Sequence, residues 1–182
     1  MRPSQEVAKL ESVVYLERMD SSRVAAIRFF ADLPEAELAA VADVAFELEV
    51  DTGQELAKQQ GLGHAVFAVE SGTAEIVIGG RPVRTIGTGD VVGEIAVLGS
   101  APDPFEAPET PEGGQRTASV VATSPMRLIG LFRRDVWALD RQAPAAARRL
   151  RETMERHRAA DEQRVLDEQQ GSAGADPRRD ST

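Results

Sequence analysis

One segment of this 182-residue chain has residue types that suit the binding of a small anion. It begins like a strand and turns helical at Gly93, and a glycine lets the backbone approach a ligand closely. The free N–H groups of the first helical turn, at about Ile95 and Ala96, would point at that ligand and favour a negative charge. The negative charge of Glu94 would repel an anion. Glu94 would instead accept a hydrogen bond from a neutral hydroxyl, as acidic residues do for a ribose.

Arg116 supplies the complementary charge, 22 positions after Glu94. It stands at the head of an expected strand, Thr117–Ala122, and its planar guanidinium can give a phosphate two parallel hydrogen bonds. A hydroxyl acceptor, an anion site and an arginine together describe a ribose that carries one phosphate. The alternatives are a solvated arginine at a strand end and a carboxylate that only the helix dipole stabilises.

The composition excludes several other kinds of site. The absence of cysteine removes disulfides, thiolate metal sites and cysteine nucleophiles. The two histidines, His64 and His157, are too few for a histidine-rich metal site, so we expect neither a bound metal nor an enzyme. We interpret His64 as a surface imidazole. His157 falls in a charged helical segment, and we interpret it as an exposed residue rather than a lid over a ligand.

The charge pattern argues against nucleic acid and membranes as partners. The net charge is −9 at pH 7, and all of it lies in residues 1–143, because the eight arginines and eight acids from residue 144 onward cancel. An acidic body is a poor surface for nucleic acid, whose binding depends on Lys and Arg. The sequence has no apolar run long enough to span a membrane and no clean signal peptide. We therefore expect a soluble, cytoplasmic protein.

The elements that must position these residues change type along the chain. Residues 4–19 and 23–45 show helical spacing of apolar side chains, with an interruption at Asp32-Leu33-Pro34. Short apolar runs separated by glycine-rich turns then predict antiparallel β structure. The expected strands are Phe46–Val50, a run at Leu56, Ala65–Val69, Ala74–Ile78, Val83–Ile86, a run from Val91, Thr117–Ala122 and Met126–Phe132. About eight strands favour a jelly-roll barrel over a five-stranded barrel.

Helical spacing returns after the last expected strand. A short helix is expected over Arg133–Arg141, and Pro144 opens a long helix that ends at about Glu168. The acidic, proline-rich segment 101–115 is expected to be a solvated loop, and residues 169–182 a disordered tail. We therefore divide the chain into an N-terminal helical extension (1–28), a β barrel with the acidic loop as an insertion (29–143), a C-terminal lid helix (144–168) and the tail (169–182).

In this order the motifs resemble those of the cyclic-nucleotide-binding domain family, the sensor domains of catabolite activators, cyclic-nucleotide-gated channels and protein kinase A regulatory subunits. The resemblance covers about residues 29–158. It rests on Phe30, Leu33, Leu38, Val41, Gly53, Gly61, the run Phe67–Gly72, Gly89-Asp90, Gly93-Glu94-Ile95-Ala96 and Arg116-Thr117-Ala118-Ser119-Val120. The chain departs from the family in the acidic loop, which lengthens the interval between Glu94 and Arg116, and in Gly61-Leu62-Gly63, where the family often has Gly-Asp.

The resemblance implies a role for each candidate residue. Glu94 would bind the ribose 2′-hydroxyl, and Arg116 would pair with the cyclic phosphate. The base would lie near Val83, under a lid-helix residue that the sequence does not identify, and Val97 or Leu98 would relay closure of the pocket to the C-terminal helices. The site residues that the resemblance implies are Gly93, Glu94, Ile95, Ala96, Arg116, Thr117, Ala118 and Val83.

The function that the resemblance implies is that of a regulatory sensor. It would bind cAMP, or cGMP, in the barrel and transmit binding through its C-terminal helices to a separate effector protein. Only 14 residues follow Glu168, so we expect no helix-turn-helix for DNA binding. The alternative is a degenerate member of the family that binds no nucleotide and serves as an interaction or scaffold domain, with the acidic loop filling or shielding the pocket. Homodimer formation through the helices at 4–19 and 144–166 is left open.

Overall fold

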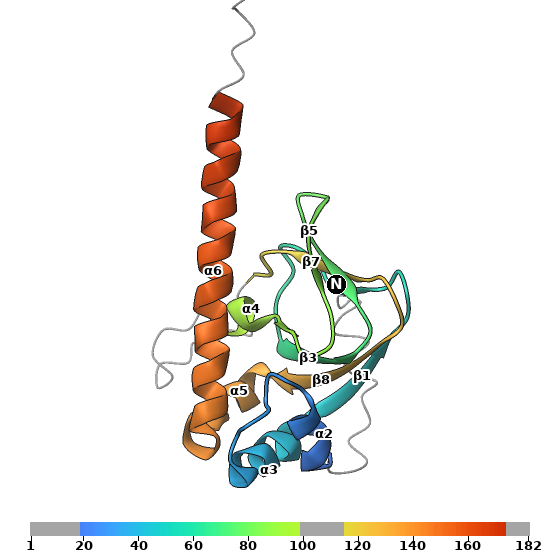
Figure 1. Ribbon diagram of the computed structural model, residues 1–182, viewed down its shortest axis with the longest axis vertical. Coiled ribbons are helices and arrows are strands. Elements are labelled where there is room, and N and C mark those ends of the chain that lie inside the picture. The colour runs from blue at the N-terminus through green and yellow to red at the C-terminus, as the bar shows by residue number, and fades with distance from the viewer. Residues whose placement is uncertain (1–18, 99–114, 174–182) are drawn as a thin grey trace, which may run out of the picture.

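The strands form two antiparallel sheets, with helices packed against one of them (Figure 1). The structure is a computed structural model that describes residues 19–98 and 115–173. The strand order is β1-β8-β3-β6 in one sheet and β2-β7-β4-β5 in the other. The strands are β1 (Phe46–Val50), β2 (Glu55–Ala57), β3 (Ala65–Ser71), β4 (Ala74–Ile78), β5 (Arg81–Ile86), β6 (Val91–Val92), β7 (Ser119–Ala122) and β8 (Met126–Phe132). The expected fold class, eight strands with flanking helices, is confirmed.

Two strands differ from their expected bounds near the candidate site. β5 begins at Arg81 and includes Pro82, which the edge position of this strand tolerates because an edge residue needs no ladder N–H. β7 begins at Ser119 rather than at Thr117. Thr117 and Ala118 therefore lie in a bend ahead of the strand, outside its hydrogen-bonded ladder.

The helices of the described part are α2 (Ser21–Ala26), α3 (Glu35–Val44), α4 (Glu94–Leu98), α5 (Arg133–Gln142) and α6 (Pro144–Ala173). The helical stretch expected over 23–45 is thus two helices, separated by a turn in which Asp32 has a φ of 65°. Residues 169–173, which the sequence analysis assigned to a disordered tail, belong to α6. Apart from Met19 and Gln115, the expected helix over 4–19, the acidic loop and the remainder of the tail lie outside the described residues.

The sheet β1-β8-β3-β6 separates two apolar cores. Because side chains alternate between the faces of a strand, Val66 and Ala68 of β3 pack against the helices, whereas Phe67 and Val69 pack against the other sheet. Both faces of β3 are therefore buried over Ala65–Val69, which explains the apolar run in this part of the strand.

The long helix α6 begins against the helical core and passes α4, and its C-terminal part extends beyond the sheets (Figure 1). Its start is fixed by Glu37 of α3, whose Oε2 accepts hydrogen bonds from the amides of Ala145 and Ala146 at 2.9 and 3.1 Å. None of the helices in the described ranges combines the length and the apolar character that crossing a membrane requires.

Candidate functional site

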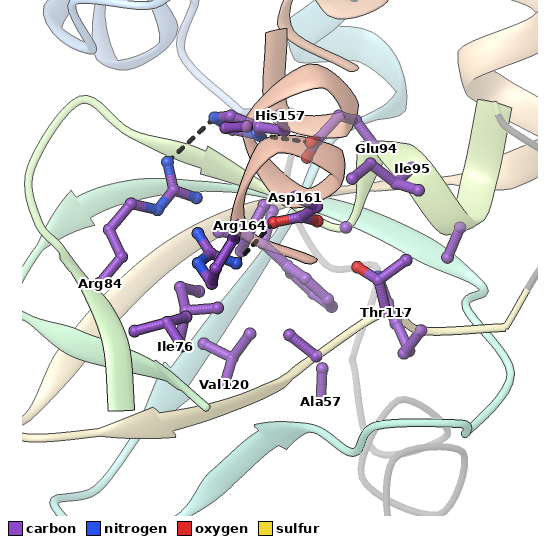
Figure 2. Close-up of a pocket in the computed structure, with 18 residues that line it drawn as sticks. Ala57, Ile76, Arg84, Glu94, Ile95, Thr117, Val120, His157, Asp161 and Arg164 are labelled. Carbon is purple, nitrogen blue, oxygen red and sulfur yellow. Dashed lines mark hydrogen bonds and ion pairs between the residues drawn. The ribbon is translucent and has the colours of Figure 1, made fainter. Parts of the chain in front are cut away.

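A pocket bounded by the two sheets, α4 and α6 brings together all eight residues singled out in the sequence (Figure 2). These are Val83, Gly93, Glu94, Ile95, Ala96, Arg116, Thr117 and Ala118. The space in and in front of this pocket is about 720 Å³, a volume that includes open solvent at its mouth. Its remaining apolar wall consists of Ala57, Phe67, Ile76, Val92 and Val120. Within the described ranges, no cluster of three metal-ligating side chains is present.

Glu94 is the buried carboxylate of this pocket. It is the first residue of α4, and only 2% of it is exposed. Its Oε1 is 2.6 Å from Nδ1 of His157, whereas its Oε2 has no hydrogen-bond partner among the described residues. A buried acceptor without a partner costs about 1–3 kcal/mol, and more when it is charged. Oε2 is therefore available to accept a hydrogen bond from a ligand hydroxyl.

Arg116 is the buried cation of the same pocket and is 4% exposed, so it is not a solvated residue at a strand end. Its Nη2 donates to the carbonyl of Ala65 at 3.0 Å, and its guanidinium carbon lies 5.9 Å from the ring centre of Phe67. Its backbone exchanges hydrogen bonds with Gln60 and Gly61 at 2.8 and 2.7 Å. These contacts hold a positive charge in a fixed position beside the N-terminus of α4.

Two glycines leave the space that the guanidinium occupies. Gly93 has a φ of +91°, and a Cβ there would lie 2.2 Å from Nη1 of Arg116 and 2.8 Å from the carbonyl oxygen of Ala65. A Cβ on Gly63 would lie 2.4 Å from that of Ala96 and 3.2 Å from Nε of Arg116. Gly63 was not among the predicted site residues, although it lies in the glycine pair by which the chain departs from the family that it resembles.

His157 is the residue that the sequence analysis misplaced. Its side chain is only 22% exposed, and it lies between Glu94 and Arg84 of β5, with its Nε2 3.0 Å from Nη1 of Arg84 (Figure 2). The expectation of an exposed histidine is wrong because α6 passes over the pocket at this point. The charged sequence of α6 carries no signal of that contact, which depends on where the helix packs.

The mouth of the pocket is lined by one face of α6. In addition to His157, this face presents Ala160, Asp161 and Arg164. The guanidinium of Arg164 donates to Oδ1 of Asp161 at 2.9 Å, so an anion and a cation stand side by side over the mouth (Figure 2). These side chains stand where the sequence analysis expected a lid residue that it did not identify.

Comparison with known proteins gives a consistent match for this chain. The family model described as "Cyclic nucleotide-binding domain" matches residues 47–142, just over half of the chain. The cyclic AMP receptor protein of Thermus thermophilus is 32% identical over 103 residues, which are 54% of this chain and 42% of that protein. The cAMP-dependent protein kinase regulatory subunit of Yarrowia lipolytica is 31% identical over 112 residues, 62% of this chain and 24% of that protein.

A solved structure agrees with these matches. The crystal structure of the Thermus thermophilus catabolite activator protein superposes with a TM-score of 0.61 at 28% identity, covering 76% of this chain and 62% of that one. The chain spans less than half the length of each of the curated relatives that it matches. The similarity therefore concerns a shared domain rather than whole proteins.

Proposed function

Because the chain belongs to the cyclic nucleotide-binding domain family, we propose that it is a regulatory module that binds cAMP or cGMP in the pocket between its sheets. The observation that carries this proposal is the pair of opposite buried charges in that pocket. Glu94 keeps one carboxylate oxygen without a partner among the described residues, and Arg116 lies in the same space. A ribose that carries a cyclic phosphate has the matching groups, a hydroxyl donor and an anion.

The two charged side chains bind different parts of the ligand. Oε2 of Glu94 accepts from the ribose 2′-hydroxyl, which removes the cost of its missing partner. Arg116 pairs with the cyclic phosphate, which approaches closely because Gly93 has no side chain. The amides of Ile95 and Ala96 in the first turn of α4 add donors to the same anion.

The base lies between an apolar wall and the lid helix. Val83 of β5 and Ile76 of β4 offer a surface for the purine ring, and Asp161 and Arg164 face it from α6. One carboxylate and one guanidinium can bond to the polar edge of adenine or of guanine. The proposal therefore covers both cAMP, the ligand in the names of the two relatives compared above, and cGMP.

Ligand binding alters the packing of the C-terminal helices through α4. Val97 of α4 is fully buried in the helical core, and Leu98 packs against the same core. A ligand shifts a conformational equilibrium only by its difference in affinity between the two states. Micromolar binding corresponds to about 8 kcal/mol in total, so a shift of a few kcal/mol is within reach. The responding effector is a separate protein or a second copy of this chain.

The test is a titration with cAMP, cGMP and AMP, followed by calorimetry and thermal melting. We expect heat and a raised melting temperature with at least one cyclic nucleotide, and little with AMP, which lacks the cyclic phosphate. Arg116→Ala should weaken binding at least about 100-fold, because it removes charge-assisted hydrogen bonds to the phosphate.

Arg81→Ala is the matched control, since Arg81 is an exposed arginine of β5 outside the pocket. Circular dichroism of Arg116→Ala separates loss of binding from loss of the fold. The absence of heat with both cyclic nucleotides, at protein concentrations well above micromolar, would contradict the proposal.

A further inference from the structure

A row of hydrogen-bonding groups joins β5 to the pocket carboxylate through the lid helix. Nη1 of Arg84 lies 3.0 Å from Nε2 of His157, and Nδ1 of His157 lies 2.6 Å from Oε1 of Glu94 (Figure 2). The three side chains come from β5, α6 and α4, and His157 of α6 is 73 residues from Arg84 and 63 residues from Glu94. The imidazole of His157 therefore connects α6 to the buried carboxylate of Glu94.

The two partners determine where the proton of this imidazole lies. An arginine side chain has only donors, so Nε2 of His157 must accept the hydrogen bond from Arg84 and carries no proton. The neutral ring then carries its proton on Nδ1, which donates to the carboxylate of Glu94. His157 is thus a neutral donor to Glu94, in one of its two tautomers.

This arrangement assigns different tasks to the two oxygens of Glu94. Oε1 is engaged by the lid helix, and Oε2 is buried with no hydrogen-bond partner in the described part of the chain. Rotation of the carboxylate would break its bond to His157. Oε2 is therefore held in one orientation, which is what a site for a ligand hydroxyl requires.

We infer that His157 is a positioning residue of the nucleotide site, which orients Glu94 and ties α6 to the bound ribose. This inference rests on the proposed function, because it needs a ribose on Oε2. A hydroxyl on Oε2 and the imidazole on Oε1 stabilise the same carboxylate orientation. Docking of α6 and binding of the ligand thus favour each other, and this coupling is reciprocal. Helix α6 senses the ribose through one side chain.

The first test needs no nucleotide. Nitrogen NMR of the imidazoles at pH 8, above the ordinary pKa of histidine of about 6.5, reports which ring nitrogen carries the proton. The chain has two histidines, so the variant His64→Asn assigns the signals of His157. We expect a protonated Nδ1 and an unprotonated Nε2, and Arg84→Ala should remove this preference. A proton on Nε2 in the wild type would overturn the inference.

The second test follows backbone hydrogen exchange in residues 150–164 of α6, with and without cAMP or cGMP. In the wild type, ligand should slow exchange in this segment. His157→Ala should weaken binding about tenfold and remove the ligand-induced slowing, because Glu94 is no longer bonded to α6. His157→Asn, whose amide can donate near the position of Nδ1, should restore part of both.

The control is Glu155→Ala, an exposed position of α6 that does not line the pocket. Equal affinity and equal slowing of exchange in His157→Ala and in the wild type would refute the role of His157. If the wild type binds neither nucleotide, the proposed function fails. Two measurements without nucleotide then still decide whether His157 holds Glu94. They are the tautomer of His157 and the hydrogen exchange of α6, which should be faster in His157→Ala than in the wild type.

Discussion

Glu94 and Arg116 are opposite charges buried in one pocket, and each is held by a contact from another part of the chain. His157 of α6 fixes the carboxylate, and the carbonyl of Ala65 in β3 fixes the guanidinium. Moving a charge out of water costs free energy, so each buried charge must be balanced by hydrogen bonds and opposite charges from the protein or from a ligand. At this scale the site depends as much on absent side chains as on present ones, since Gly63 and Gly93 leave room for the guanidinium.

Gly63→Ala tests the space beside the guanidinium of Arg116. The added methyl group would lie 2.4 Å from the Cβ of Ala96 and 3.2 Å from Nε of Arg116, so the backbone or the guanidinium must move. Overpacking of this kind costs about 1–3 kcal/mol of stability. We expect a lower melting temperature and about tenfold weaker binding of the cyclic nucleotide, measured by calorimetry.

The matched control is Gly87→Ala, because a Cβ there would make only an ordinary contact, 3.7 Å from the methyl group of Thr73. It should leave nucleotide affinity unchanged. Wild-type affinity in Gly63→Ala would show that the space beside Arg116 is not needed for the ligand.

At the scale of elements, α6 contacts both the pocket and the helical core. Its first turn is held by Glu37 of α3, and its middle carries His157 over the pocket. Leu150, which is fully buried between these points, anchors the helix in the helical core. The two polar contacts lie on either side of this apolar anchor.

Glu37→Gln tests the anchor at the start of α6. The carboxylate accepts from two amides of the first turn, an arrangement that the helix dipole favours. Glutamine keeps one acceptor oxygen but loses the charge, so the free energy of unfolding should fall by about 1 kcal/mol, the size of a charge–dipole interaction at a partly buried helix end. Chemical denaturation measures this, and hydrogen exchange should be faster at Ala145 and Ala146.

Glu35→Gln is the control for this prediction, because Glu35 lies in the same first turn of α3 but is exposed. A loss of stability as large as that of Glu37→Gln would mean that the charge in α3, rather than the contact with α6, is responsible.

At the scale of the whole molecule, one ionic network ties the N-terminal helices to the sheet. Arg23 of α2 donates to both oxygens of Glu70 in β3 at 3.0 and 2.9 Å, and it also forms an ion pair with Glu47 of β1. Arg127 of β8 lies 3.5 Å from Glu70. Three strands and a helix are therefore joined in one network around Glu70 and Arg23, on the side of the sheet that carries the helical core.

This network predicts how stability depends on pH. The hydrogen bonds from Arg23, opposed in part by burial, lower the pKa of Glu70 below its usual value. A carboxyl group whose pKa is lowered in the folded state stabilises the protein above its unfolded pKa, about 4.3, and this stabilisation disappears as pH falls through the folded pKa. Glu70→Gln should cost about 1 kcal/mol near neutral pH and progressively less below pH 4.

Thermal melting between pH 3 and pH 7 measures this difference. Arg23→Ala should remove most of the same pH dependence, and the double variant should show no further loss from this pair. A Glu70→Gln effect that persists undiminished at pH 3 would mean that the packing of the side chain, not its charge, stabilises the contact.

Local properties of the chain were sufficient to predict much of this protein. The alternation of apolar side chains and the glycine turns predicted the strands, and β1, β4 and β8 have the expected bounds. The types of Glu94 and Arg116 indicated a hydroxyl acceptor and an anion site, and the resemblance of the surrounding motifs to the family predicted that the two residues share a pocket.

Contacts between distant segments were decided only by the tertiary structure. His157 is 63 residues from Glu94, and Glu37 is 108 residues from Ala145, so no periodic pattern links either pair. Gly63 has a role only because the chain brings it beside Ala96 and Arg116. Periodicity determines which face of an element is buried, but not which element covers it. Which element covers a face depends on how the two cores and the long helix pack together. In this protein that packing places His157, from the charged helix α6, on the carboxylate of Glu94.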